Sequence, residues 1–180
     1  MEGRPPEANV GREGVVDAAW MRDQLVRHEA ALMRYAASIT GDVERARDVV
    51  QETFLRLWQA DREELGEHVA PWLFAVCRNR ALDVARKEVR MQLVGSAPAE
   101  KAAEGGETPL GQVMAKEATR RALAGLEGLA PREREVVRLK FQGGLSYKEI
   151  SAVTGLSVSN VGYVLHHALK ALRERVEGAA

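Results

Sequence analysis

One stretch near the C-terminus, Leu145–Arg175, constrains the fold more than any other part of the chain. Ser146 followed three residues later by Glu149 is a capping box, which predicts that a short helix begins at Tyr147. Gly155 follows that helix, and glycine adopts the left-handed conformation that a tight turn between helices needs. The stretch therefore begins as a short capped helix and a turn.

A second, longer helix follows the turn. Ser157 or Ser159 can cap it, and its apolar residues recur at helical spacing. They are Val161, Val164, Leu165, Ala168, Leu169 and Leu172. Two helices joined by a short glycine turn describe a helix-turn-helix, whose second helix lies in the DNA major groove. The alternative is an ordinary helical hairpin in a bundle.

The second helix carries no Lys, Arg, Asp or Glu between Ser157 and Leu169, which is unusual for a helix that reads DNA. Contacts to phosphates would then come from neighbouring positions. The candidates are Lys148, Lys170, Arg173 and Arg175.

The composition predicts an all-α protein, because strand signals are nearly absent from the 180 residues. The 26 basic and 26 acidic residues balance, so any basic patch is local. A single cysteine, Cys77, excludes a disulfide framework within the chain and is expected to fill the core. No apolar run approaches the roughly 18 residues of a membrane span, so we expect a soluble, cytoplasmic protein without membrane insertion. No catalytic motif, metal-ligand cluster or phosphate loop is visible, so we expect no enzyme, no metal and no cofactor.

The chain divides into two small helical domains joined by a flexible linker. We expect a disordered N-terminal arm at 1–14, a first domain at 15–90 and a second domain at 112–177. The segment 91–111, rich in Gly, Ala, Glu and Pro, is the expected linker. Besides the helix-turn-helix, helices are expected at 15–40, 43–60, 71–90, 112–126 and 131–141. Asp61–Ala70 is predicted to be a loop or an irregular turn, with Pro71 at the first position of the next helix.

The helix at 43–60 has two different sides. Val50, Phe54, Leu57 and Trp58 form its expected buried stripe, and Asp48, Gln51, Glu52 and Arg56 lie opposite. Leu55 also lies outside the stripe, near the acidic residues. A solvated face with one stray leucine is one interpretation. A mixed acidic and apolar surface for a protein partner is the other.

The helix at 71–90 is the most basic surface of the N-terminal half. Asn79, Asp83, Arg86 and Arg90 form an outward row, flanked by Arg78 and Lys87. Basic residues near an exposed aromatic, for which Trp72 is the candidate, suit a single-stranded nucleic acid. Positive charges favoured at a helix end by its dipole are an equally simple interpretation.

Two separate stretches resemble one family. The residues RYAASITGDVERARDVVQETFLRLWQA and PWLFAVCRNRALDVARKEVR resemble region 2 of bacterial extracytoplasmic-function sigma factors. The residues LAPREREVVRLKFQGGLSYKEISAVTGLSVSNVGYVLHHALKALRERV resemble region 4 of the same family. The resemblance covers residues 25–90 and 122–176, and the order, the linker and the length also fit.

The resemblance implies a promoter-specificity subunit of RNA polymerase. In that family, the residues matching Asp48, Gln51, Glu52 and Leu55 contact the clamp helices of the polymerase's largest subunit, and region 4 contacts the flap. It implies that the loop at 61–70 and the next helix capture a flipped base of the −10 element. Flipping a base out of the stack costs a few kcal/mol, and a preformed pocket would offset that cost, so DNA melting needs no ATP. The −10 set is Trp72, Arg78, Asn79, Arg80, Asp83 and Arg86, with Asn79 near the base and the arginines on phosphates. The −35 set is Lys148, Ser157, Ser159, Asn160, Tyr163, His166, His167 and Lys170.

The recognition helix departs from the family pattern, because it has Gly162, Tyr163 and His166-His167 where relatives carry Arg or Lys. Asn160 could pair bidentately with adenine. The two histidines are either partly protonated or neutral and packed. Family membership also implies an anti-sigma protein as a regulatory partner. A stand-alone helix-turn-helix regulator remains the alternative, and dimerisation on a palindromic site would favour it.

Overall fold

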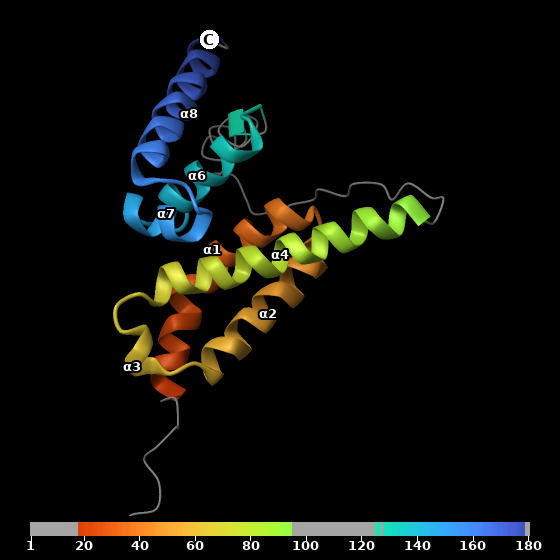
Figure 1. Cartoon of the computed structure of the whole chain (residues 1–180), viewed down its shortest axis with the longest axis vertical. Helices are drawn as coiled ribbons and strands as arrows, with labels where there is room; N and C mark the ends of the chain where they lie inside the picture. Colours follow the sequence, from red (N-terminus) through yellow and green to blue (C-terminus); the bar gives the residue numbers. More distant parts are fainter. Residues whose placement is uncertain (1–17, 95–124, 127, 179–180) are drawn as a thin grey trace, which may run out of the picture.

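The chain folds into helices throughout the part that the structure describes. This computed structural model describes residues 18–94, 125–126 and 128–178. Its elements are α1 (Ala18–Thr40), α2 (Val43–Gln59), α3 (Arg62–Leu65), α4 (Val69–Val94), α6 (Pro131–Phe141), α7 (Tyr147–Thr154) and α8 (Val158–Gly178). The all-α prediction is confirmed (Figure 1). The expected N-terminal arm, most of the expected linker and most of the helix expected at 112–126 lie outside the described residues.

The N-terminal unit is built from α1, α2 and α4, which pack against one another. The ring of Tyr35 meets the ring of Phe74 edge-on, with centroids 5.4 Å apart. Leu32, Leu57 and Leu73 are fully buried in the same core. The core of this unit is therefore large and partly aromatic.

Two expectations for this unit are wrong. The segment Asp61–Ala70 is not wholly a loop, because the Asp61 carboxylate accepts hydrogen bonds from the backbone N–H groups of Glu63 (2.8 Å) and Glu64 (3.4 Å) and caps the one-turn helix α3. The helix α4 begins at Val69 rather than Pro71. Proline is tolerated there because the first N–H groups of a helix have no partner within it.

Trp58 does not belong to the buried stripe of α2, since 47% of its surface is exposed. It lies one helical position beyond the fully buried Leu57, so its side chain points in a different direction from that of Leu57. The helix α4 also continues to Val94, four residues into the segment expected to be the linker.

The C-terminal unit confirms the helix-turn-helix in detail. Ser146 and Glu149 form the predicted capping box, with N–H to oxygen distances of 2.7 and 3.3 Å. Gly155 ends α7 in the left-handed conformation, at φ 75° and ψ 6°. The Ser157 hydroxyl accepts the N–H of Asn160 at 3.2 Å, so Ser157 rather than Ser159 caps α8. The core of this unit is aliphatic, and its fully buried members include Val136, Leu139, Ile150 and Val161.

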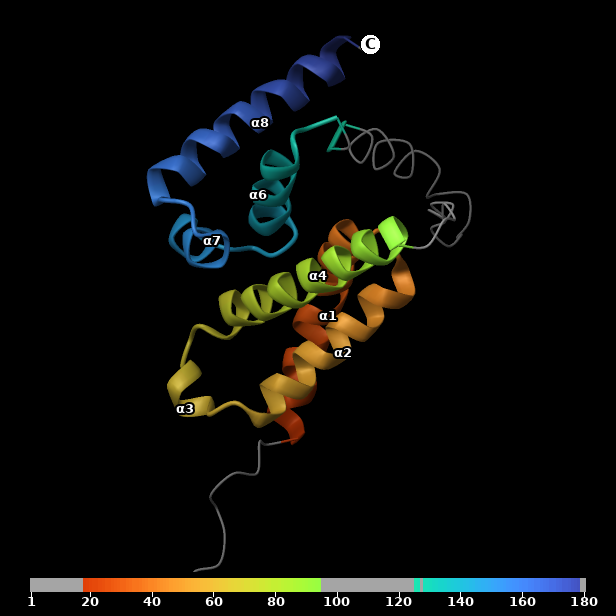
Figure 2. The ribbon, with the colours of Figure 1, turned by 45° about the vertical axis from the view of Figure 1, so that its right-hand side comes forward.

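The two units touch along α4. In both views α4 lies between α2 on one side and the helices α6–α8 on the other (Figures 1 and 2). The closest packing across this junction is between α4 and α7. The helix that carries the expected −10 residues therefore also forms the boundary with the C-terminal unit.

Candidate polymerase and nucleic-acid interfaces

The outward face of α2 carries the predicted polymerase-binding residues. Asp48, Gln51 and Leu55 are all exposed and follow one another at i, i+3 and i+7, so they share one side of the helix. Leu55 is 63% exposed. Glu52 differs from them: it pairs with Arg56 at 2.7 Å and also with Arg80 of α4. The structure thus brings together three of the four predicted polymerase-binding residues and ties the fourth to α4.

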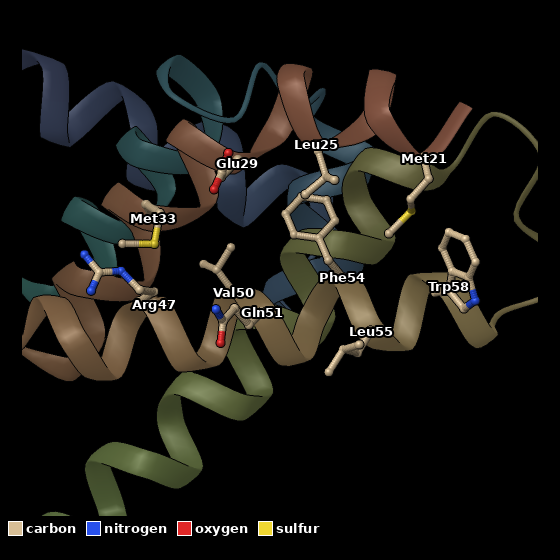
Figure 3. Close-up of a pocket in the computed structure, with 10 residues that line it drawn as sticks. All are labelled: Met21, Leu25, Glu29, Met33, Arg47, Val50, Gln51, Phe54, Leu55 and Trp58. Atoms are coloured by element: carbon tan, nitrogen blue, oxygen red, sulfur yellow. The ribbon is translucent and has the colours of Figure 1, made fainter. Parts of the chain in front are cut away.

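A groove of about 760 Å³ runs along the same side, between α1 and α2 (Figure 3). It is lined by Met21, Leu25, Glu29, Met33, Arg47, Val50, Gln51, Phe54, Leu55 and Trp58. The sequence analysis missed the part of α1 in this surface. The signal was present, since Met21, Leu25 and Met33 recur at multiples of four residues, but it is the same signal that a buried helix face gives. The groove extends the apolar part of the α2 face across to α1.

The predicted −10 residues on α4 divide between three environments. Asn79, Asp83 and Arg86 are exposed and form the predicted outward row, with Arg86 and Asp83 3.5 Å apart. Arg80 points to Glu52 of α2, and Arg78 points to the C-terminal unit. Only the outward row is therefore open to solvent as a group.

Trp72 is not the exposed aromatic that the sequence suggested. It is half-buried and packs against the core. It lines a cavity of about 400 Å³ between α4 and α7, together with His68, Lys148 and Glu149. The first turns of α4, where the expected base pocket lies, therefore face α7.

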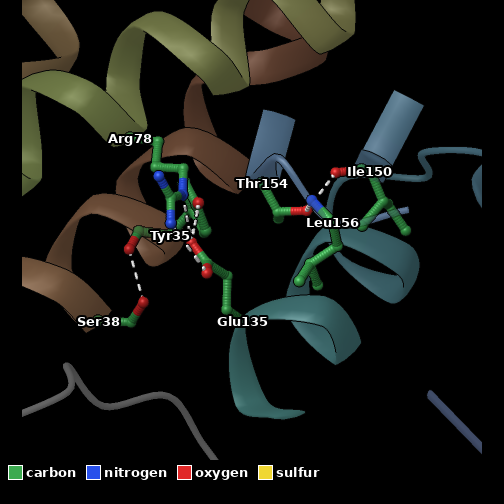
Figure 4. A network of polar contacts seen from close by, with 7 residues as sticks. All are labelled: Tyr35, Ser38, Arg78, Glu135, Ile150, Thr154 and Leu156. Atoms are coloured by element: carbon green, nitrogen blue, oxygen red, sulfur yellow. Dashed lines mark hydrogen bonds and ion pairs between the residues drawn. The ribbon is translucent and has the colours of Figure 1, made fainter. Parts of the chain in front are cut away.

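A carboxylate that sequence reasoning missed lies at the centre of the junction (Figure 4). Glu135 of α6 accepts a hydrogen bond from the Tyr35 hydroxyl at 2.8 Å and two from the Arg78 guanidinium at 2.8 and 3.4 Å. The hydrogen bond to Glu135 raises the pKa of Arg78. Burial, together with the negative charge of Glu135, raises the pKa of Tyr35 far above its ordinary range. Glu135 stands 57 and 100 residues from its partners, so no local pattern could have revealed it.

The first turns of α8 present polar and aromatic side chains and contain no Lys, Arg, Asp or Glu. Ser157, Ser159, Asn160, Tyr163, His166 and His167 are all exposed. The rings of Tyr163 and His167 lie 4.2 Å apart, and those of His166 and His167 lie 5.9 Å apart. The histidines are thus not packed into the core. Lys148 is exposed on α7, and Lys170 lies 3.9 Å from Glu174.

Cys77 is buried, as expected, and burial raises the pKa of its thiol to about 12. Among the residues that the structure describes, no three His, Cys, Asp or Glu side chains are grouped as metal ligands. No helix in the described part of the chain combines the length and apolar character that crossing a membrane requires.

Comparison with known families identifies both units. Residues 25–91 match the family described as Sigma-70 region 2, and residues 119–172 match the family described as Sigma-70, region 4. The first match falls on the N-terminal unit and the second on the C-terminal unit.

Two curated relatives are similar over most of their length. The ECF RNA polymerase sigma factor SigL of Mycobacterium tuberculosis is 33% identical over 174 residues, which cover 92% of this chain and 94% of SigL. The ECF RNA polymerase sigma factor SigM of Bacillus subtilis is 34% identical over 151 residues, covering 79% and 88% respectively. The chain therefore belongs to the extracytoplasmic-function family of RNA polymerase sigma factors. Sigma factors are non-enzymatic initiation factors that work with core RNA polymerase and promoter DNA.

Two solved structures share the fold. The sigma factor RpoE of Bartonella quintana, solved with the anti-sigma factor NepR, aligns with a TM-score of 0.70 and 21% identity over 88% of this chain and 97% of that one. CnrH, solved with the cytosolic domain of CnrY, aligns with a TM-score of 0.60 and 24% identity over 89% of both chains.

Proposed function

We propose that this sigma factor divides its work among three surfaces. The face of α2 binds core polymerase, the outward row of α4 meets the −10 element, and the first turns of α8 read the −35 element. The single observation that carries the proposal is the face formed by Asp48, Gln51 and Leu55. An exposed leucine flanked by an acid and an amide, and continuous with an apolar groove, suits a protein partner better than solvent.

The polymerase surface would be centred on Leu55. A buried apolar anchor surrounded by polar groups is the usual arrangement of a binding hot spot. Asp48 and Gln51 supply the polar rim, and Glu52 holds α2 to α4 through Arg80. We therefore assign Glu52 a positioning part in addition to any contact with the polymerase.

The −10 surface would use Asn79 for a base and Arg86 for a phosphate, with Asp83 beside them. Arg78, Arg80 and Trp72 complete the set expected from the family. Each of these three is engaged within the protein in the present conformation, through Glu135, Glu52 and the α7 junction respectively.

The −35 surface would read bases without lysine or arginine on the first turns of α8. Asn160 is placed in the first turn of α8 and can pair bidentately with adenine. Tyr163 and the two histidines offer ring faces and edges to bases and thymine methyl groups. Phosphate contacts would come from Lys148 on α7 and Lys170 further along α8.

Regulation by an anti-sigma protein is part of the proposal. Both solved structures of similar fold were determined with such a partner or a cytosolic domain bound. We place the protein in the cytoplasm, where core polymerase and promoter DNA are found. A chain that binds core polymerase at full strength in native extract, with no inhibitor recovered, would contradict the regulatory part.

The test is co-elution with purified core RNA polymerase on a sizing column. The variant Asp48→Ala with Leu55→Ala should lose co-elution while keeping its helical content. The control is Val26→Ala, which truncates an even more exposed apolar residue on α1 and should co-elute normally. If the unmodified chain runs alone, with no inhibitor bound, the assignment fails and a stand-alone DNA-binding regulator is the better hypothesis.

A further inference from the structure

The junction between the two units contains a contact that closes the protein on itself. Tyr35, Arg78 and Glu135 come from α1, α4 and α6, and we call these three residues the Glu135 latch (Figure 4). Tyr35 is 1% exposed, and the side chains of Arg78 and Glu135 are 23% and 20% exposed. Both side chains of the Arg78–Glu135 ion pair are thus less than a quarter exposed.

Partial burial makes this pair matter more than a surface ion pair. Exposed pairs contribute little because water and salt screen them. A largely buried carboxylate held by a guanidinium fork and a tyrosine hydroxyl is costly to leave without its partners. The latch therefore favours the closed arrangement of the two units.

A second contact supports the closed arrangement. A Cβ atom at Gly143, in the turn between α6 and α7, would lie 3.0 Å from the ring of Phe74 and 2.7 Å from the carbonyl oxygen of Leu139. The turn thus sits directly on α4, on the same ring that packs against Tyr35 of the latch. The negative charge of Glu149 on α7 also faces His68, just before α4.

The closed arrangement covers residues that DNA would need. Arg78 is held by Glu135, and Trp72 lies in the junction with α7. A carboxylate and a phosphate bind the same guanidinium fork, so the two compete for it. A cavity of about 400 Å³, lined in part by Ser38, Arg132 and Glu135, leads to the latch and gives an incoming anion access.

We propose that Glu135 is an internal competitor of promoter DNA: its carboxylate occupies the phosphate-binding position of Arg78 and keeps free protein closed until polymerase separates the two units. This inference rests on the proposed −10 role of Arg78. Polymerase binding would release the latch because the two units then bind separate surfaces of the polymerase. A ligand shifts the equilibrium between closed and open protein by the difference in its affinity for the two states.

The test compares three variants of the full chain by small-angle scattering and by binding to a labelled single-stranded oligothymidylate. Glu135→Gln removes the charge but keeps an acceptor for Tyr35. Tyr35→Phe removes one hydrogen bond and keeps the ring on Phe74. Glu174→Gln, on the exposed far part of α8, is the control of matched charge. Circular dichroism checks that each variant is folded.

We expect Glu135→Gln to increase the radius of gyration and to bind the oligothymidylate about three- to tenfold more tightly, because apparent affinity scales with the fraction of competent protein. Tyr35→Phe should do the same to a smaller degree, and Glu174→Gln should change neither quantity. Adding Arg78→Ala to Glu135→Gln should abolish the gain in affinity while the protein stays open.

Two results would overturn the inference, and they have different meanings. An unchanged radius of gyration in Glu135→Gln shows that the latch does not hold the units together, whatever Arg78 does on DNA. An increased radius with unchanged oligonucleotide affinity shows that Arg78 is not a phosphate contact, which removes the competition and the −10 assignment of Arg78. Co-elution of the unmodified chain with core polymerase is a separate measurement, so a failure here is distinguishable from a failure of the proposed polymerase surface.

Discussion

The helices α2 and α8 both carry a proposed recognition surface, but they are held in place in different ways. Behind α2 lies a core that includes the paired rings of Tyr35 and Phe74. Behind α8 lies a smaller aliphatic core, and the helix is set at its angle by local devices: the capping box of α7, the left-handed Gly155 and the Ser157 cap. Their surfaces differ as well, since α2 mixes acids with an exposed leucine, and the first turns of α8 contain no Lys, Arg, Asp or Glu.

The difference teaches where each recognition surface is vulnerable. Substitutions that create cavities in the core should destabilise the N-terminal unit most. Substitutions in the turn and at the helix caps should destabilise the C-terminal unit most. All three tryptophans, Trp20, Trp58 and Trp72, lie in the N-terminal unit. Tryptophan fluorescence therefore follows that unit, with Trp72 also sensing its junction with α7, while circular dichroism follows both units.

The largest effect is expected from Leu57→Ala. Leu57 is fully buried on the inner side of α2, and truncation of such a leucine costs about 2–5 kcal/mol. Urea unfolding followed by tryptophan fluorescence measures the loss. Leu55→Ala, two residues away but exposed, should stay within about 0.5 kcal/mol of the unmodified chain. Equal losses in the two variants would contradict the division of α2 into a core side and a contact side.

The next effect is on DNA recognition by α8. Asn160→Ala should cost about 1–3 kcal/mol of discrimination at one base pair of the −35 element, as loss of a bidentate base contact does. Competition binding between matched and single-substituted duplexes measures it. Lys148→Ala is the comparison, because a phosphate contact should weaken all duplexes alike and lower the salt dependence by about one counterion. If Asn160→Ala weakens binding to all duplexes equally, Asn160 does not contact a base.

A smaller effect is expected at the turn of the helix-turn-helix. Gly155→Ala should destabilise the C-terminal unit by about 1–2 kcal/mol, because alanine resists the left-handed conformation. Nothing lies within 4 Å of a Cβ at this position, so the cost is backbone strain and not collision. Gly162→Ala, inside α8 with ordinary contacts to Tyr147, should instead stabilise by about 0.5–1 kcal/mol. Thermal unfolding by circular dichroism should show shifts of opposite sign.

The smallest effect is a pH dependence of α7. Hydrogen bonds from Ser146 lower the pKa of Glu149 below its ordinary value. The capping box therefore contributes stability above that ordinary value, and the contribution is lost as the pH falls through the lowered pKa of the folded state. Glu149→Gln keeps a capping acceptor, so its stability should vary less between neutral and acid pH. Equal pH dependence in the two proteins would show that Glu149 is not the group that titrates.

The parts of the fold that follow from short stretches were predictable. The bounds of α6, the start of α7 at the Ser146 capping box and the turn at Gly155 all depend on residues within a few positions of one another. The exposed side of α2 was predictable too, since helical spacing alone places Leu55 beside Asp48 and Gln51.

The parts that depend on packing between distant segments were not predictable. Trp58 was assigned to the wrong side of α2, because periodicity does not say how wide the buried stripe is. Arg78 and Arg80 were expected to contact phosphates from a basic helix, but each forms an ion pair with a glutamate of another helix. The closed junction depends on these pairings, and composition or spacing gives no sign of them.

The most direct test of the account is to map the transcripts that core RNA polymerase from the source bacterium makes from fragmented genomic DNA when this chain is added. The account predicts start sites that share a −10 and a −35 element at fixed spacing. With Asn160→Ala, the same −10 element should remain and the −35 element should become less defined. Start sites that do not depend on the chain, or a single palindromic motif in place of two spaced elements, would contradict it.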